Sequence, residues 1–275
     1  MRKIYLFFYL FLVSYSSISQ YNYLFVIENK NGDRLPYASI SWGRSNGVSA
    51  NEHGIVKFSS SNLIDTIYAS NIGYSVSTTT IENLEKVNDT LRILLEFDQP
   101  FLPPITLFSK EKNVVVGITD PETSFISNRY RNVLAAVEIQ QPGETCKIKS
   151  ISVFIHKKSQ QQVPFRIRVF DKNQQGFPDK DLLRENVICT KYQLNQWNEI
   201  NLSDNNILTS DKHFFIAIEW LNIPELNDNN DLQIGLTNKE SRQITLFKLS
   251  NKPWKKFGLG DGKFDNIMLK AILIH

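Results

Sequence analysis

The stretch NGVSANEHGIVKF places a carboxylate and an imidazole, Glu52 and His53, side by side, a pairing that could bind a metal or transfer a proton. On an extended chain adjacent side chains point to opposite faces, so the two cannot converge on one ion. A zinc site also needs further His, Cys or carboxylate ligands, and no second His or Cys lies nearby. The preceding Asn51 can instead bond its own backbone, while the following glycine takes a positive φ. We therefore expect a turn that closes a hairpin between Val48 and Ile55, with His53 facing solvent.

The rest of the sequence offers few residues for acid–base chemistry. It contains four histidines, and it has no Gly-x-Ser-x-Gly elbow, His-Glu-x-x-His helix, phosphate-binding loop or Cys-x-x-Cys pair. Catalytic carboxylates leave no such motif, so an enzyme or enzyme accessory for glycan or peptide hydrolysis, with a carboxylate site in the C-terminal half of the chain, stays an alternative. Glu138 and Glu219 are the carboxylates to examine. Glu219 lies inside FFIAIEWL, where pairing with a neighbouring arginine or exposure to solvent is the other interpretation.

Two acidic loops could supply oxygen ligands to calcium. ELNDNNDLQ offers Asp228 and Asp231, and GLGDGKFDN offers Asp261 and Asp265. Calcium takes about six to eight oxygens, and neither loop follows the EF-hand spacing. Turn-forming Asn, Asp and Gly would give the same pattern, so we expect no cofactor, with calcium as the alternative.

Three aromatic residues are candidates for stacking on a ligand: Trp254, Tyr192 and Trp220. Trp254 is preferred because NKPWKKFG is a polar segment that we expect to form an exposed loop. Aromatic residues of β-sandwiches also pack in the core or at sheet edges, which is the alternative for all three.

The two cysteines, Cys146 and Cys189, fall in the same half of the chain. An oxidising compartment would permit a disulfide between them. Two buried free thiols on separate strands are the alternative, since spacing alone does not show whether the side chains meet.

The composition favours strands and gives no footprint for nucleic acid. The chain has 31 basic and 28 acidic residues, and 12% of its residues are aromatic. A net charge of +3 is too small for a nucleic-acid surface. Short runs rich in Ile, Val, Thr and Tyr, separated by Asn-Gly and other turns, are typical of an all-β chain.

The N-terminal segment MRKIYLFFYLFLVSYSSISQ has the three parts of a secretory signal, with cleavage expected between Ser19 and Gln20. The later sequence contains no apolar stretch long enough for a membrane helix. Pro100, Pro103 and Pro104 favour an extended connector. We therefore divide the chain into a signal peptide (1–19), a first β-sandwich (20–98), a Pro-rich linker (99–112) and a second β-sandwich (113–275).

The region from Tyr23 to Phe97 resembles the carboxypeptidase regulatory-like domain, a prealbumin-like Greek-key sandwich common in exported proteins of Bacteroidota-type bacteria. ENKNGDRLPYASISW, GVSANEHGIVKF and IYASNIGYSVSTTTI carry the likeness. The residues on the family positions are Pro36, Ala38, Ile40, Gly47, Asn51, Gly54, Phe58, Gly73 and Tyr74. The sequence departs at Ala50, where the family usually has threonine, and at Asn51, where it usually has aspartate.

The second half resembles the sandwich that often follows this domain in surface proteins. FRIRVFDKNQQGFPDKDLL, NQWNEINLSDNNI and HFFIAIEWL are its markers, and they predict an antiparallel sandwich of jelly-roll type. We expect an exported, non-enzymatic binding or scaffold protein of the cell envelope, located in the periplasm, on the outer-membrane surface or outside the cell. The first sandwich would be a spacer or docking unit, and the second would bind a glycan or an envelope protein.

Overall fold

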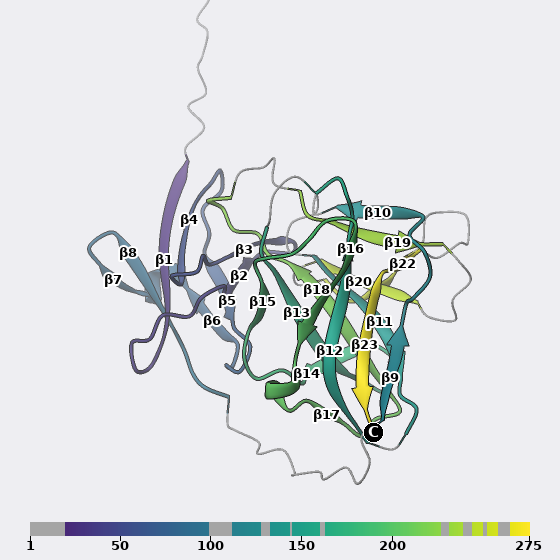
Figure 1. Ribbon diagram of the computed structural model, residues 1–275. Coiled ribbons are helices and arrows are strands. Elements are labelled where there is room, and N and C mark those ends of the chain that lie inside the picture. The colour runs from purple at the N-terminus through teal and green to yellow at the C-terminus, as the bar shows by residue number, and fades with distance from the viewer. Residues whose placement is uncertain are drawn as a thin grey trace, which may run out of the picture.

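The computed structural model describes residues 20–98, 112–127, 133–143, 145–159, 163–226, 231–238, 244–249, 252–257 and 265–275. The predicted signal peptide (1–19) and nearly all of the predicted linker (99–112) lie outside these ranges. The described residues form two four-stranded sheets, one eight-stranded sheet and one seven-stranded sheet (Figure 1). The prediction of an all-β chain built from sandwiches is therefore confirmed.

The first sandwich consists of the two four-stranded sheets, which we call sheets A and B. Sheet A has the order β4-β1-β8-β7, with β1 (Tyr21–Asn29), β4 (Ile55–Ser60), β7 (Glu85–Val87) and β8 (Thr90–Leu95). Sheet B has the order β3-β2-β5-β6, with β2 (Ser39–Trp42), β3 (Asn46–Ser49), β5 (Thr66–Ser70) and β6 (Ser77–Thr80). A short 3-10 turn, η1 (Ile81–Asn83), follows β6. Alternate residues of β1, namely Tyr23, Phe25 and Ile27, enter a core shared with sheet B.

The Asn51 turn has the expected local geometry, although the predicted hairpin is wrong. The Asn51 side chain accepts hydrogen bonds from the backbone N–H of His53 at 3.0 Å and of Ile55 at 3.1 Å. Gly54 adopts φ +69°, and the His53 side chain is 73% exposed. However, β3 pairs with β2 in sheet B, whereas β4 pairs with β1 in sheet A. The turn therefore carries the chain from one sheet to the other.

The second sandwich consists of the eight-stranded and seven-stranded sheets, whose described pairings are all antiparallel. The eight-stranded sheet comprises β9 (Asn113–Gly117), β10 (Ser124–Ser127), β12 (Cys146–Ile155), β16 (Gln196–Asn201), β17 (Leu208–Thr209), β19 (Gln233–Thr237), β22 (Asn266–Ile267) and β23 (Leu269–Ile274). The seven-stranded sheet comprises β11 (Val133–Gln140), β13 (Phe165–Lys172), β14 (Pro178–Asp181), β15 (Val187–Cys189), β18 (His213–Trp220), β20 (Thr245–Leu249) and β21 (Lys255–Lys256). A second 3-10 turn, η2 (Ser203–Asn205), follows β16.

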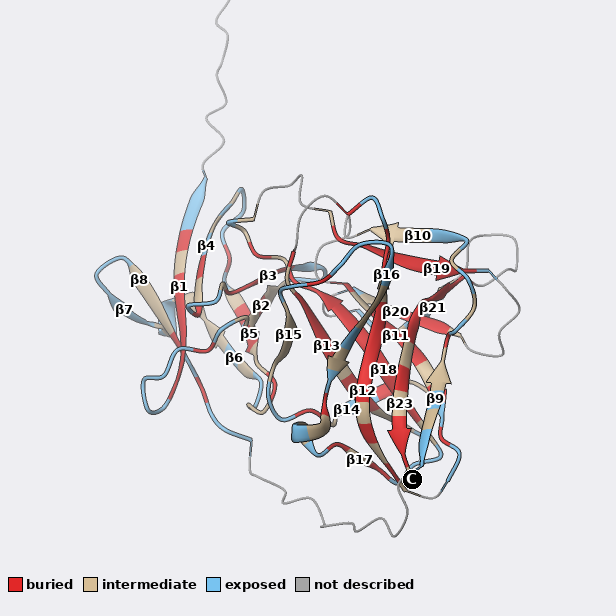
Figure 2. Cartoon of the chain, viewed as in Figure 1, coloured by how far each residue is buried: buried red, intermediate tan, exposed pale blue. Residues whose placement is uncertain are grey.

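The alternation of residues along β13 decides which side chains enter the core. Phe165, Ile167 and Val169 are fully buried between the two sheets. Figure 2 shows the buried stretches of the strands in red. Arg166 and Arg168 consequently point to the opposite face of the seven-stranded sheet. That face also carries a small apolar cluster, which includes Phe170, Phe215 and Leu246 with Trp254 at its margin.

The two cysteines, for which the sequence left a disulfide and two free thiols open, are free thiols in this structure. Cys146 begins β12 in the eight-stranded sheet, whereas Cys189 ends β15 in the seven-stranded sheet. Burial raises the pKa of both thiols. The structure therefore has the second alternative, two thiols on separate strands.

None of the helices in the part of the chain that the structure describes has the length and apolar character needed to cross a bilayer.

Candidate functional site

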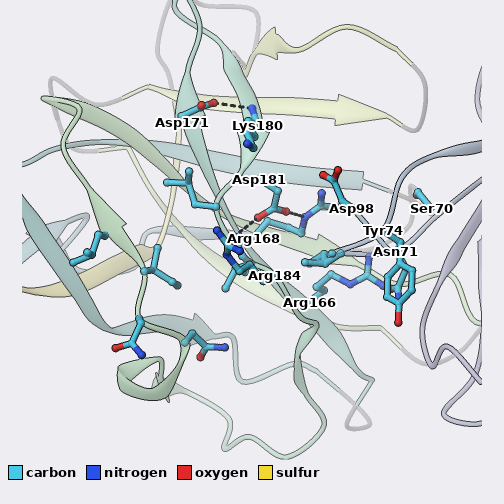
Figure 3. A pocket seen from close by; sticks show the side chains of 18 of the residues that line it. Ser70, Asn71, Tyr74, Asp98, Arg166, Arg168, Asp171, Lys180, Asp181 and Arg184 are labelled. Atoms are coloured by element: carbon cyan, nitrogen blue, oxygen red, sulfur yellow. Dashed lines mark hydrogen bonds and ion pairs between the residues drawn. The ribbon is translucent and has the colours of Figure 1, made fainter. Parts of the chain in front are cut away.

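A cavity of about 780 Å³ lies where the two sandwiches meet; we call it the junction cavity (Figure 3). The first sandwich contributes the segment after β5, from Ser70 to Tyr74, together with Val76, Phe97 and Asp98. The second sandwich contributes side chains of β13 and β14 and of the loops that contain Arg184 and Asn205. Cavities of this size are typical of small-molecule sites, which often form between domains.

Two arginines of β13 form the polar floor of the junction cavity. Because Arg166 and Glu219 are paired in register on β13 and β18, their side chains share one face of the sheet. Glu219 Oε2 accepts hydrogen bonds from Nη1 of Arg166 at 3.1 Å and from Nη1 of Arg168 at 3.0 Å. Arg168 also donates from Nε to the carboxylate of Asp181. The result is a chain of two guanidinium groups and two carboxylates, which we call the charge cluster.

Within the charge cluster, Glu219 and Arg168 are held in their ionised forms by their neighbours, whereas burial lowers the pKa of Arg166 and raises that of Asp181. Burial alone would raise the pKa of Glu219, but Arg166 and Arg168 outweigh it and hold the pKa of that carboxyl below its usual range. Burial lowers the pKa of Arg166, whose side chain is 2% exposed, while Asp181 and Glu219 raise the pKa of Arg168 despite its burial. Glu219 therefore stays a carboxylate and supports the two arginines.

Arg166 reaches from the second sandwich into the first. Its Nη2 donates to the backbone carbonyl of Tyr37, a residue with φ +58°, a conformation uncommon for an aromatic residue. Its Nε has no hydrogen-bond partner within the described residues, although it is buried. Buried N–H donors almost always have a partner, so this one is an exception at a residue that lines the cavity.

Several polar contacts fix the two sandwiches against each other. Asn186 donates to the carbonyl of Pro36 at 3.1 Å and to the side-chain oxygen of Asn71 at 2.7 Å. The backbone N–H of Ser49 donates to the carbonyl of Asn222 at 2.7 Å. The Asn222 side chain donates in return to the carbonyl of Gly47 at 2.7 Å.

The backbones of the two sandwiches also touch directly at the cavity wall. Ile72 belongs to the first sandwich by sequence, yet it packs in the core cluster of the second. The neighbouring Gly73 has φ +82°, and a Cβ atom there would lie 2.1 Å from the carbonyl oxygen of Arg184. Only glycine permits this approach. The wall of the junction cavity thus depends on a close backbone contact.

An aromatic pair lines the cavity on the side of the first sandwich. The rings of Tyr74 and Phe97 lie 4.5 Å apart between centroids, and Phe97 is 66% exposed. These residues come from the loop after β5 and from the segment after β8, joined by an isolated bridge. An exposed ring beside polar groups offers an apolar surface to a ligand. Neither residue was among the aromatic candidates that the sequence suggested.

The polar lining supplies both donors and acceptors. Arg166, Arg168, Lys180 and Arg184 bring positive groups to the cavity, and Asp98, Asp171 and Asp181 bring carboxylates. The backbone N–H of Lys180 donates to Asp171 at 2.6 Å. Burial raises the pKa of Asp171. A lining of this kind suits a ligand that carries many groups able both to donate and to accept hydrogen bonds.

The structure places the three predicted stacking residues outside the junction cavity. Tyr192 is 5% exposed, and its hydroxyl accepts a hydrogen bond from the backbone N–H of Val163 at 2.6 Å. Trp220 is 2% exposed, and its indole N–H donates to the carbonyl of Leu232 at 3.1 Å. Both pack in the core, so the prediction that they present a ring to a ligand is wrong in this structure.

Trp254 lies on the outer face of the seven-stranded sheet. Its ring meets Phe170 edge to face at 5.9 Å, and the ammonium group of Lys248 lies 5.9 Å from its centre. It remains partly exposed. Trp254 is therefore a partly exposed aromatic residue that does not line the junction cavity.

The calcium candidates are not brought together. Asp228 and Asp261 lie outside the described residues. Asp231 precedes β19, whereas Asp265 precedes β22, which pairs with the other end of β19. In the described ranges no group of three or more His, Cys, Asp or Glu side chains could hold a metal ion.

Of the two carboxylates examined for catalysis, Glu219 pairs with arginines in the charge cluster. Glu138 lies on β11, where Lys172 contacts its Oε1 at 2.5 Å and Nδ1 of His213 contacts the same atom at 2.9 Å. The interpretation of Glu219 as the partner of a neighbouring arginine is confirmed.

The sequence matches no protein-family model and no curated protein. Among solved structures, the chain is similar to a clostridial cysteine protease, Cwp84, after propeptide cleavage, at 10% identity and a TM-score of 0.45. The alignment covers 58% of this chain and 40% of that one. It is also similar to the cysteine protease and lectin-like domains of Cwp84, a surface layer associated protein of Clostridium difficile, at 9% identity and a TM-score of 0.40. Here the alignment covers 57% of this chain and 37% of the other.

Proposed function

We propose that this protein is an exported, non-enzymatic cell-envelope protein that binds a neutral glycan in the junction cavity. The observation that carries the proposal is the combination of an aromatic pair, the partly buried Tyr74 and the exposed Phe97, with a buried charge cluster whose Arg166 Nε has no partner among the described residues. A sugar ring offers an apolar face for stacking and hydroxyl groups that both donate and accept.

The charges of the cavity favour a neutral ligand over an acidic one. Glu219 and Asp181 neutralise Arg166 and Arg168. Lys180 and Arg184 are balanced by Asp98 and Asp171 within the same lining. Hydroxyl groups can bond to either sign of partner, whereas a carboxylate or ammonium group on the ligand would meet like charges.

In this proposal the first sandwich is a docking unit that forms one wall of the site. The likeness to the carboxypeptidase regulatory-like domain supports that role through residues with a visible structural purpose. Asn51 and Gly54 shape the turn between the sheets, and Gly73 and Tyr74 form the cavity wall. The leader-type segment at residues 1–19 supports export. Mass spectrometry of the exported protein should show a chain that begins at Gln20.

The decisive experiment is a glycan array with the mature chain, followed by titration calorimetry on the polysaccharides that it retains. Phe97→Ala should weaken binding about five- to tenfold, because it removes a stacking contact of about 1 kcal/mol. Leu63→Ala is the matched control, since Leu63 is a 68% exposed apolar residue of the same sandwich that does not line the cavity. An empty array at high protein concentration, with a protein captured in pull-downs, would favour an envelope protein as the ligand. If Phe97→Ala and Leu63→Ala weaken binding equally, the glycan does not bind in the junction cavity.

A second candidate function, hydrolysis of a glycan or peptide, is favoured by Asp171. Burial raises the pKa of this carboxyl, which lines the junction cavity, and a raised pKa is the property of a general acid. A glycosidase and peptidase panel separates the two functions. Turnover that disappears in Asp171→Asn while ligand binding persists would identify an enzyme.

A further inference from the structure

The outer face of the eight-stranded sheet holds a histidine whose two ring nitrogens have very different surroundings. Nδ1 of His156 lies 2.7 Å from Oε1 of Glu122. The imidazole stacks on Phe125, with ring centroids 4.3 Å apart. Nε2 is buried and has no hydrogen-bond partner among the described residues, and the residue as a whole is 7% exposed. The carboxylate therefore orients the ring so that Nε2 carries the lone pair.

Two further unpartnered acceptors belong to residues at the start of the neighbouring strand, β19, which lies opposite His156. The pairing of Ile155 with Ile234 places His156 opposite Gln233, and the backbone N–H of His156 donates to the Gln233 carbonyl at 2.9 Å. Opposite residues of an antiparallel pair project to the same face. The Gln233 amide donates to Oδ2 of Asp231 at 2.6 Å, which holds those two side chains together.

These contacts leave one acceptor of each residue unused. Oε1 of Gln233 and Oδ1 of Asp231 are buried and unpartnered, like Nε2 of His156, and Gln233 is 8% exposed. Buried acceptors are almost always satisfied. Three acceptors without a donor among the described residues are satisfied by ordered water, by donors on a ligand or by a cation, and a cation is the partner that can engage all three at once.

We infer that His156, Gln233 and Asp231 form a binding site for a divalent transition-metal ion. The ion would take Nε2, Oε1 and Oδ1 as ligands, with its remaining positions open to water. Imidazole nitrogen combined with oxygen donors suits ions such as Zn²⁺ and Ni²⁺. The set contains an amide oxygen, so it is distinct from a group of three His, Cys, Asp or Glu side chains, which the described residues lack.

Glu122 contacts the ring nitrogen of His156 that would not bind the metal. Many metal-binding histidines have a carboxylate in this position. Such a carboxylate accepts the other ring N–H, fixes the tautomer and makes the ligating nitrogen more basic. Gly235 leaves room for it, since a Cβ atom there would lie 3.0 Å from Glu122 Oε1 and 2.8 Å from Phe154 and Met268 side-chain atoms. Glu122 is thus a positioning residue for the site.

The site can be tested with Zn²⁺ alone on the mature chain after dialysis against a chelator. Titration calorimetry should show one ion bound per chain. Long-range ¹H–¹⁵N spectra of the four histidines should show a change in the ring nitrogens of one of them. His156→Ala should abolish binding, and Glu122→Gln should weaken it about 10- to 100-fold. His53→Ala is the matched control, because His53 also has a glutamate neighbour but is exposed.

Two outcomes would overturn the inference. One is the absence of Zn²⁺ binding by the folded protein. The other is binding that survives in both His156→Ala and Asp231→Asn, which would mark an adventitious ion elsewhere. Thermal unfolding of each variant shows whether it has folded. Asp231→Asn preserves shape at a partly exposed position, so it remains informative if His156→Ala does not fold.

Discussion

The carbonyl oxygen of Arg184 occupies the space where a side chain on Gly73 would begin, 2.1 Å from the position of its Cβ atom. This contact joins the loop after β5 of the first sandwich to the loop after β14 of the second. Both residues line the junction cavity.

Gly73→Ala should therefore separate the two sandwiches at the cavity wall. We expect a loss of about 2–4 kcal/mol in the free energy of unfolding, combining steric overlap with the strain of a positive φ, and a loss of glycan binding. Gly32→Ala is the matched control: Gly32 has φ +84° but nothing lies within 4 Å of its added Cβ. It should cost about 1 kcal/mol and leave binding intact. Urea unfolding and calorimetry measure both effects, and equal losses in the two variants would contradict the role of the contact.

Glu219→Gln should destabilise the protein strongly, because it leaves Arg166 and Arg168 buried without their shared carboxylate. Removing one member of a buried ion pair costs about 3–5 kcal/mol. Glu85→Gln should change stability by less than about 1 kcal/mol, since its pair with Arg92 is exposed. Urea unfolding of the two variants at neutral pH compares them, and a small effect of Glu219→Gln would show that the arginines do not depend on it.

The lowered pKa of Glu219 also predicts how the stability of the protein depends on pH. The pKa of Glu219 is lowered in the folded protein, so its contribution is fully present above the unfolded pKa of about 4.3 and is lost as pH falls through the folded pKa. The difference in unfolding free energy between the native protein and Glu219→Gln should be constant at neutral pH and shrink in acid. If the difference in unfolding free energy between the two proteins grows in acid, the pKa of Glu219 is not lowered by folding.

Asn51→Ala should lower the unfolding free energy by about 1–2 kcal/mol, because two backbone N–H groups lose their side-chain acceptor. His53→Ala, two residues further on, should change it by less than about 0.5 kcal/mol. Thermal denaturation of both variants measures the two changes in stability. A large effect of His53→Ala would restore a specific role to that imidazole.

The two thiols should be slow to alkylate in the folded protein at neutral pH, since burial raises the pKa of Cys146 and of Cys189. Unfolding in urea should expose both. Peptide mapping of the exported protein without reductant should recover each cysteine as a free thiol, and a linked peptide would contradict the separation of their strands.

Local features of this chain follow from its sequence more readily than long-range ones. Asn51 and the glycine that ends its turn have a signature that depends only on neighbouring residues, so the turn forms as expected. The same signature does not say whether the flanking strands pair with each other, and here they enter different sheets. For the same reason the sequence left open whether Cys146 and Cys189 meet, and their strands also enter different sheets.

The candidate site was harder to find because it is assembled from both sandwiches. FRIRVFD alternates arginine with apolar residues, which is a recognisable sign that Arg166 and Arg168 share one face of a buried strand. Nothing in the sequence brings Phe97 to Tyr74. Trp220 ends a strand that is buried along nearly its whole length, so alternation could not predict which face its ring would take.

The paired hydrogen bonds between Asn222 and the backbone of Gly47 and Ser49 have a consequence for any shortened form of the protein. They lie along β3, which is one of the two edge strands of sheet B. An uncovered outer strand presents free backbone groups that recruit strands of other molecules. A fragment that stops before the second sandwich would lose this cover, so we expect it to self-associate through β3, whereas the complete chain keeps that edge occupied.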